Sequence, residues 1–162
     1  MNKVIYLIFI IMIITCNSFS PEKLWKDANY MLENDKLKES VILLKKIIED
    51  YPEHKYSVKS QFKIAKIYLN DKKEYDIAIE EFNKVIKNYP SSQEAMNSLF
   101  MIGYIYNNNL NAYSDAIRTY NLFLKKFPDD ELIPSVNYEL ENLKKHKNEI
   151  DSLNNLINNK YK

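Results

Sequence analysis

The sequence predicts an all-α protein, a solenoid of about three and a half helix-turn-helix repeats closed by a C-terminal capping helix. Two observations carry this prediction. Aromatic-proline pairs recur at an interval of 38 residues, and small residues recur in the same register. The composition agrees, because a chain of 162 residues with only one Gly and five Pro can form long uninterrupted helices.

Residues 1–15 have the organisation of a secretory signal peptide. A short cationic start, Met1-Asn2-Lys3, precedes the unbroken apolar run of residues 4–14. This run is shorter than the roughly 20 apolar residues that a membrane-spanning helix needs. The only cysteine, Cys16, follows directly after the run, and we expect residues 16–20 to form a short linker to the first helix.

The segment Ile13-Ile14-Thr15-Cys16 resembles the lipobox of bacterial lipoproteins. This resemblance implies that Cys16 becomes the lipidated first residue of the mature protein and holds it at a membrane. Thr15 stands where the lipobox usually has Gly, Ala or Ser. The small residues Ser18 and Ser20 leave a second interpretation open, in which the ordinary signal peptidase cleaves the chain and releases a soluble protein.

The repeats are defined by three sets of residues. The small residues of the first helices are Ala28, Ala65 and Gly103, those of the second helices are Ser40, Ala78 and Ala116, and the prolines are Pro52, Pro90 and Pro128. Two helices whose axes lie about 8–10 Å apart need small side chains where they approach most closely. We therefore expect the small residues of each pair to face each other, and each proline to separate one pair from the next.

The register places full repeats at residues 21–54, 55–92 and 93–130, and a half repeat at 131–145. In the half repeat Glu141 replaces the small residue, so this helix does not need a close partner. We expect it to cap the stack, with residues 146–162 as a helical extension whose Asn-rich end frays. A docking helix or a short coiled coil is the alternative interpretation of this extension.

Two consecutive repeats resemble the tetratricopeptide repeat (TPR). The matching residues are Ile64, Ala65, Tyr68, Ala78, Phe82 and Pro90, and then Ile102, Gly103, Tyr106, Ala116, Tyr120 and Pro128. The resemblance covers about residues 21–145 and implies a TPR-type α-solenoid that binds other proteins without catalysis and without a cofactor. With its lipobox-like leader, the chain resembles envelope TPR lipoproteins of the outer-membrane β-barrel assembly machinery or the Tol–Pal-associated type.

An aromatic residue recurs three positions before the small residue of each first helix, or before Glu141. These aromatic residues are Trp25, Phe62, Phe100 and Tyr138. In TPR proteins the first helices line a concave groove, so the row is either packing between repeats or a strip that binds an extended peptide. The neighbouring positions that would contact a peptide backbone are Asn29, Lys66, Tyr104 and Asn142.

Composition excludes several classes of function. The chain has 23 basic and 22 acidic side chains, so it lacks the cationic surplus of a nucleic-acid-binding protein. One Gly excludes glycine-rich phosphate-binding loops, and one Cys excludes a Cys-based zinc site. His54 and His146 have no partner at a motif spacing, so we expect neither a catalytic nor a metal site.

The sequence therefore predicts a non-enzymatic scaffold that binds a protein or an extended peptide in its groove, within a multiprotein envelope complex. The resemblance places it at the outer membrane, facing the periplasm, anchored through Cys16 and active in outer-membrane protein assembly or envelope maintenance. A soluble periplasmic adaptor of a secretion or cell-wall enzyme complex is one alternative. An envelope hydrolase is another, and it would need a buried carboxylate or histidine cluster in the groove.

Overall fold

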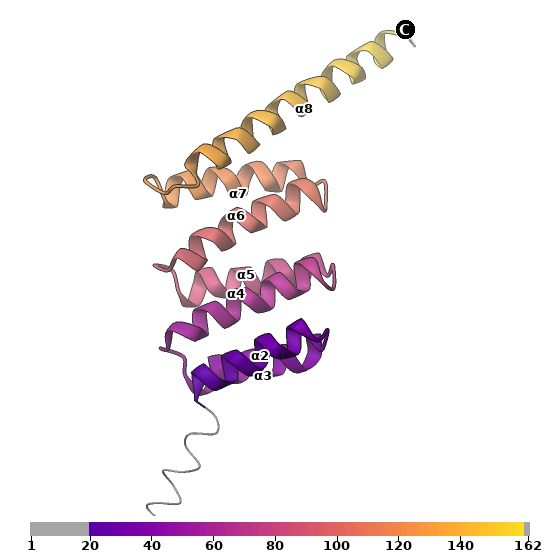
Figure 1. Ribbon diagram of the computed structural model, residues 1–162. Coiled ribbons are helices and arrows are strands. Elements are labelled where there is room, and N and C mark those ends of the chain that lie inside the picture. Colours follow the sequence, from indigo (N-terminus) through magenta and orange to yellow (C-terminus); the bar gives the residue numbers. More distant parts are fainter. Residues whose placement is uncertain (1–19, 161–162) are drawn as a thin grey trace, which may run out of the picture. The chain divides into compact units, whose positions relative to one another are not determined.

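The computed structural model describes residues 20–160, and every regular element in this range is a helix (Figure 1). The chain forms two compact units, which divide between Tyr89 and Pro90. The first unit contains α2 (Pro21–Glu33), α3 (Leu37–Asp50), α4 (Lys55–Asn70) and α5 (Tyr75–Asn88). The second unit contains α6 (Gln93–Asn108), α7 (Tyr113–Lys126) and α8 (Ile133–Lys160). The all-α fold of helical pairs is confirmed, and the expected leader with Cys16 lies outside the described residues.

Each second helix ends at the aromatic residue that precedes a proline. Tyr51, Tyr89 and Phe127 have φ angles of −137°, −133° and −130°, and each donates its backbone N–H to the carbonyl oxygen four residues earlier. Proline disfavours the helical conformation in the residue before it. The 38-residue interval of the aromatic-proline pairs is therefore the interval at which the helices stop.

The first helices begin at polar caps. The hydroxyls of Ser20 and Ser92 accept hydrogen bonds from backbone N–H groups of the first turns of α2 and α6. At α4 the capping residue is His54, whose Nδ1 accepts from the N–H of Tyr56 at 3.2 Å. A side-chain acceptor at this position satisfies an N–H group that has no partner inside the helix.

The turn inside each helical pair contains a residue in the left-handed conformation. Asp35, Lys73 and Asn111 have φ angles of 59°, 54° and 52°, and they lie 38 residues apart. Asp and Asn tolerate this conformation better than Lys, for which it costs about 1–2 kcal/mol. These turns repeat as regularly as the prolines, although their side chains share no single residue type.

The small residues lie where the helices of a pair meet. In α2 and α3, both Ala28 and Ser40 are fully buried, and the Ser40 hydroxyl donates to the carbonyl oxygen of Ala28 at 2.8 Å. In α4 and α5, Ala65 and Ala78 are both fully buried. In the second unit, a Cβ added at Gly103 of α6 would lie 2.5 Å from Cε1 of Tyr120 on α7, which is closer than van der Waals contact allows.

Apolar side chains join successive helices within each unit. In the first unit Leu44, Ile47, Ile64 and Ile67 belong to one buried cluster, which packs α3 against α4. In the second unit α8 contacts α7, and its buried side chains are Val136, Leu140 and Leu143. The helix α8 continues without interruption through residue 145, where the sequence separates a half repeat from an extension.

We expect Gly103→Ala to destabilise the protein, although Ala is favoured over Gly inside a helix by about 1 kcal/mol. The added methyl group would meet the ring of Tyr120, which is fully buried. Overpacking of this kind typically costs about 1–3 kcal/mol, so urea denaturation should show a net loss of unfolding free energy. In a Tyr120→Leu background the same substitution should be less harmful. A stabilising effect of Gly103→Ala in the wild-type background would contradict the close packing.

Candidate functional site

The first helices of the first unit carry a stacked group of aromatic side chains. The ring of Trp25 on α2 lies parallel to the ring of Tyr56 on α4, with centroids 5.1 Å apart and an interplanar angle of 12°. The imidazole of His54 is tilted against the Tyr56 ring, with ring centroids 5.3 Å apart. Aromatic pairs of this geometry contribute about 0.5–1.5 kcal/mol beyond their buried area. The stack therefore fixes the α2 surface relative to the α4 surface.

His54 contacts both α4 and α2. Its Nδ1 accepts from the N–H of Tyr56, and its Nε2 lies 3.2 Å from the carboxylate of Glu22. His54 thus has a structural role as a helix cap and as a link between α2 and the start of α4.

Lys63 completes the cluster from α4. Its ammonium group lies 5.1 Å from the centroid of the Trp25 ring and donates to Oδ1 of Asn29 at 2.5 Å. The Asn29 amide in turn donates to the carbonyl oxygen of Trp25. We call Trp25, Asn29, Tyr56 and Lys63 the Trp25 cluster. It presents an aromatic surface and a fixed cation side by side on the first helices.

The environment of Lys63 disfavours its charged form. Burial lowers the pKa of Lys63 below its ordinary value, the charge of Lys66 lowers it further, and the carboxylate of Glu33 partly opposes the shift. Lys66 itself is exposed on the same helix. A half-buried cation beside a second cation favours the approach of an anionic or carbonyl oxygen.

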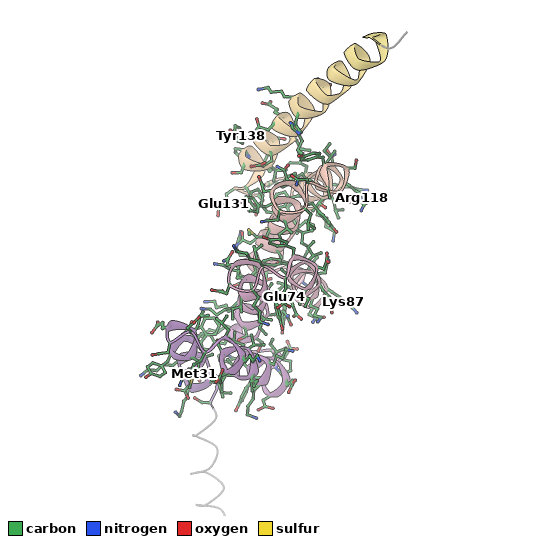
Figure 2. The ribbon with its side chains drawn as sticks, turned by 90° about the vertical axis from the view of Figure 1, so that its right-hand side faces the viewer. Met31, Glu74, Lys87, Arg118, Glu131 and Tyr138 are labelled. Carbon is green, nitrogen blue, oxygen red and sulfur yellow. The ribbon has the colours of Figure 1, made fainter. Side chains whose placement is uncertain are left out.

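The aromatic residues expected to form one row have three different surroundings. Trp25 stacks on the next first helix, whereas Phe62 and Phe100 contact the second helix of their own pair, through Phe82 at 5.5 Å and Tyr120 at 5.8 Å between ring centroids. Tyr138 is 64% exposed on α8 (Figure 2). Equivalent positions in the repeat therefore serve packing inside a pair, packing between pairs and surface exposure.

The second unit has a polar cavity beside its first helices. A cavity of about 360 Å³ is lined by the end of α6, the start of α7 and the face of α8. Its lining residues are Asn107, Asn108, Asn111, Tyr113, Asn142, Leu143 and His146. The rings of Tyr113 and His146 meet edge to face, with centroids 4.9 Å apart. Asn142, expected to contact a peptide backbone, is thus placed in an amide-rich cavity, while Tyr104 of the same unit is 40% exposed.

The sequence pattern does not single out Tyr56 and Lys63, although they hold Trp25 and Asn29 in place. Lys63 could have been found because it lies three residues before Lys66, a spacing that places two side chains on one face of a helix. Tyr56 carries no such signal, since its contact with Trp25 depends on how two separate helices pack.

Between residues 20 and 160, no group of three or more His, Cys, Asp or Glu side chains is placed to hold a metal ion. The two histidines lie in different units, and each contacts a tyrosine ring. None of the helices described is both long enough and apolar enough to cross a membrane.

Residues 17–152 match the YfiO family, which is described as outer membrane lipoprotein. The chain belongs to this family. The family and its TPR-like fold support a role in protein interaction and a location at the cell envelope. No curated protein matches the chain.

Solved structures of MamA, a TPR-repeat protein, share the fold of this YfiO-family chain. MamA of AMB-1 has 19% sequence identity and a TM-score of 0.53, over 82% of this chain and 68% of that chain. MamA of MSR-1 has 20% identity and a TM-score of 0.51, over 82% and 72%. MamA from Desulfovibrio magneticus RS-1, from residue 41 to its end, has 14% identity and a TM-score of 0.52, over 86% and 78%. At these identities the likeness shows the fold alone.

We expect the effect of Lys63→Met on stability to depend on pH, because the folded state disfavours the ammonium group. The folded-state pKa of Lys63 lies below the ordinary 10.5, so wild-type stability should rise relative to the variant as pH increases toward that value and the lysine loses its proton. Urea denaturation at pH 7 and pH 10 measures the difference. Lys59→Met removes an exposed lysine from the same helix and serves as the control for charge loss. A stability difference between Lys63→Met and the wild type that is the same at pH 7 and pH 10 would contradict this description.

Proposed function

We propose that the protein is a non-catalytic scaffold, anchored to the outer membrane by a lipid on Cys16, that acts in outer-membrane protein assembly or envelope maintenance. The single observation that carries the proposal is the match of residues 17–152 to a family of outer membrane lipoproteins. The TPR fold agrees, because stacked helical pairs present extended surfaces that bind other proteins.

The first helices are the proposed binding surface. In the first unit the Trp25 cluster offers aromatic area together with the cation of Lys63, and Lys66 lies exposed beside it. Aromatic side chains dominate the energetics of protein interfaces because they bury much area and have few rotatable bonds. An extended peptide segment could stack on this surface while its carbonyl or carboxylate oxygens contact the two lysines.

The first helices of the second unit have a different chemical character. Tyr104 and Tyr138 are exposed, and Asn142 contributes to the cavity of amide side chains. Amide groups both donate and accept hydrogen bonds, as a peptide backbone requires. We therefore propose that this unit recognises backbone and aromatic groups, whereas the first unit recognises an oxygen-bearing or acidic segment.

Lipidation of Cys16 predicts a specific chemical product. We expect the mature N-terminal peptide to begin at Cys16 and to carry a diacylglycerol group, and we expect the protein to sediment with the outer membrane. Mass spectrometry of the N-terminal peptide and fractionation of the envelope measure both properties. Cys16→Ser should lose the lipid and the membrane association, whereas Ser18→Ala should leave them unchanged. An unmodified N-terminus beyond Cys16 would support the soluble periplasmic adaptor instead.

Photo-crosslinking in intact cells tests the binding surface. Crosslinking amino acids at Lys66 of α4 and at Tyr104 of α6 should capture a partner, which we expect to be a subunit of the β-barrel assembly machinery. Both positions are exposed, so the replacement should not disturb packing, unlike a change at Phe62 or Phe100. Ile42, 64% exposed on the second helix α3, is the matched control.

The identity and the yield of the crosslinked products decide the outcome. Products at Lys66 and Tyr104 that are no more abundant than at Ile42 would contradict the first-helix surface. Products that contain only peptidoglycan-associated proteins would contradict a role in β-barrel assembly and favour envelope maintenance.

A further inference from the structure

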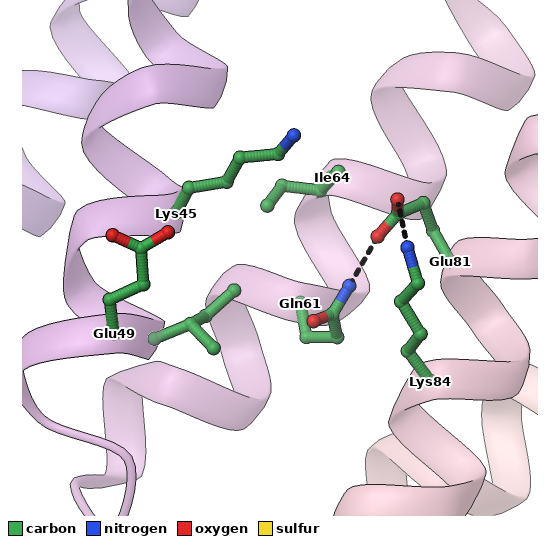
Figure 3. Close-up of a pocket in the computed structure, with 7 residues that line it drawn as sticks. Lys45, Glu49, Gln61, Ile64, Glu81 and Lys84 are labelled. Carbon is green, nitrogen blue, oxygen red and sulfur yellow. Dashed lines mark hydrogen bonds and ion pairs between the residues drawn. The ribbon is translucent and has the colours of Figure 1, made fainter.

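The first unit has a cavity that shares no residue with the Trp25 cluster. Its volume is about 230 Å³, and it is lined by side chains of α3, α4 and α5 (Figure 3). The lining residues are Lys45, Ile48, Glu49, Gln61, Ile64, Glu81 and Lys84. Ile48 and Ile64 supply apolar surface, and the other five side chains are polar or charged. A cavity of this size and composition suits one long side chain with a polar end, not a whole helix.

The cavity contains a polar pair at positions where the repeat is otherwise apolar or uncharged. Gln61 corresponds to Leu24 and Leu99 of the neighbouring first helices, and both leucines are buried. Glu81 corresponds to Leu43 and Thr119 of the neighbouring second helices. The fold therefore does not require a charge here, and in the other repeats it forms without one.

Burial of this polar pair lowers the stability of the folded protein. Gln61 is only 5% exposed and Glu81 only 7%. The carboxylate of Glu81 accepts from Nε2 of Gln61 at 2.5 Å and from Nζ of Lys84 at 2.9 Å, and these contacts offset part of the loss of hydration. A buried exception to the repeat that lies in a cavity is a candidate for function, because local rules are most often broken at functional sites.

Acceptors with spare hydrogen-bonding capacity line the cavity. Within the described part of the chain, the carbonyl oxygen of Gln61 accepts no hydrogen bond, and Figure 3 shows it on the side of the amide away from Glu81. Across the cavity on α3 lies the exposed carboxylate of Glu49. Lys84 is already held by both Glu80 and Glu81. The only cation of the lining without such a contact in this range is Lys45, which is exposed on a flexible stem.

We propose that this cavity binds an arginine side chain of a partner protein. The aliphatic stem would lie against Ile48 and Ile64, and the planar guanidinium would donate to Gln61, to Glu49 and to the Glu81 carboxylate. A guanidinium carries five N–H donors in one plane and is less strongly hydrated than an ammonium group. It therefore matches acceptors that are supplied by three different helices. Lys45 would swing away as the arginine enters.

The inference that a partner protein supplies the arginine rests on the proposed function as a protein-binding scaffold. The cavity shares no residue with the Trp25 cluster. The first unit would then hold a partner at two places: an oxygen-bearing or acidic segment on the first helices and an arginine beside the second helices. A failure at this cavity leaves the first-helix surface standing, and the two are tested by different experiments.

The test uses the full chain, labelled at its isoleucine methyl groups, and N-acetyl-arginine amide as the probe. Titration followed by NMR should shift the methyl signals of Ile48 and Ile64 in a saturable way. N-acetyl-citrulline amide has nearly the same shape as the arginine probe but no charge. Its affinity should be lower by a factor of about ten or more. Equal shifts with both probes, or no shift at these two residues, would overturn the proposal.

Variants of the lining give the matched controls. Glu49→Gln and Glu81→Gln should each weaken arginine binding several-fold, and Lys45→Gln should strengthen it by removing a competing cation. Because Glu49 is exposed, its variant keeps the test decisive even where Glu81→Gln alters folding, which circular dichroism monitors. If each of the single variants Glu49→Gln and Lys45→Gln binds arginine with unchanged affinity, the assignment is refuted.

Discussion

The close approach of two helices at a pair of small residues is the constraint on which each repeat depends. At Gly103 the requirement is strictest, since even a methyl group would meet Tyr120. At Ser40 the approach is close enough for the hydroxyl to bond the carbonyl oxygen of Ala28 on the other helix. Large side chains can pack around such a contact but cannot replace it. The rest of the pair, including which face of each helix is buried, follows from where these residues lie.

The helices themselves were predictable because their limits are set by local chemistry. A proline acts on the residue before it, so Tyr51, Tyr89 and Phe127 end their helices whatever surrounds them. The left-handed turns were not predictable in the same way. Asp35, Lys73 and Asn111 share a backbone conformation, yet Lys73 has no intrinsic preference for it. There the two helices impose the turn, and the residue tolerates it.

The candidate site shows the limit of a repeat register. Trp25 and Asn29 were among the residues chosen from the sequence, but Tyr56 and Lys63, which hold them, come from another helix at no fixed sequence interval. The register also treated Phe62 and Tyr138 as equivalent, whereas Phe62 packs against Phe82 and Tyr138 is exposed. Residues at equivalent repeat positions lie on only approximately the same face of their helices. The residues around each of them determine whether its side chain packs inside the protein or is exposed to a partner. The assignment of these residues to a peptide-binding surface therefore stays a prediction.

Deviation from the repeat is more informative about function than conformity to it. A residue that matches its equivalents, such as Ala65 or Ala78, is explained by the fold and needs no partner outside the chain. Gln61 and Glu81 are not explained in this way, because leucine occupies the position of Gln61 in both neighbouring repeats. Their burial lowers stability, and the hydrogen bonds that Gln61 and Lys84 donate to the two oxygens of Glu81 offset only part of this loss. A guanidinium from a partner would donate further hydrogen bonds to these acceptors. The buried polar pair that lowers the stability of the free protein would then make the complex selective for a partner with an arginine.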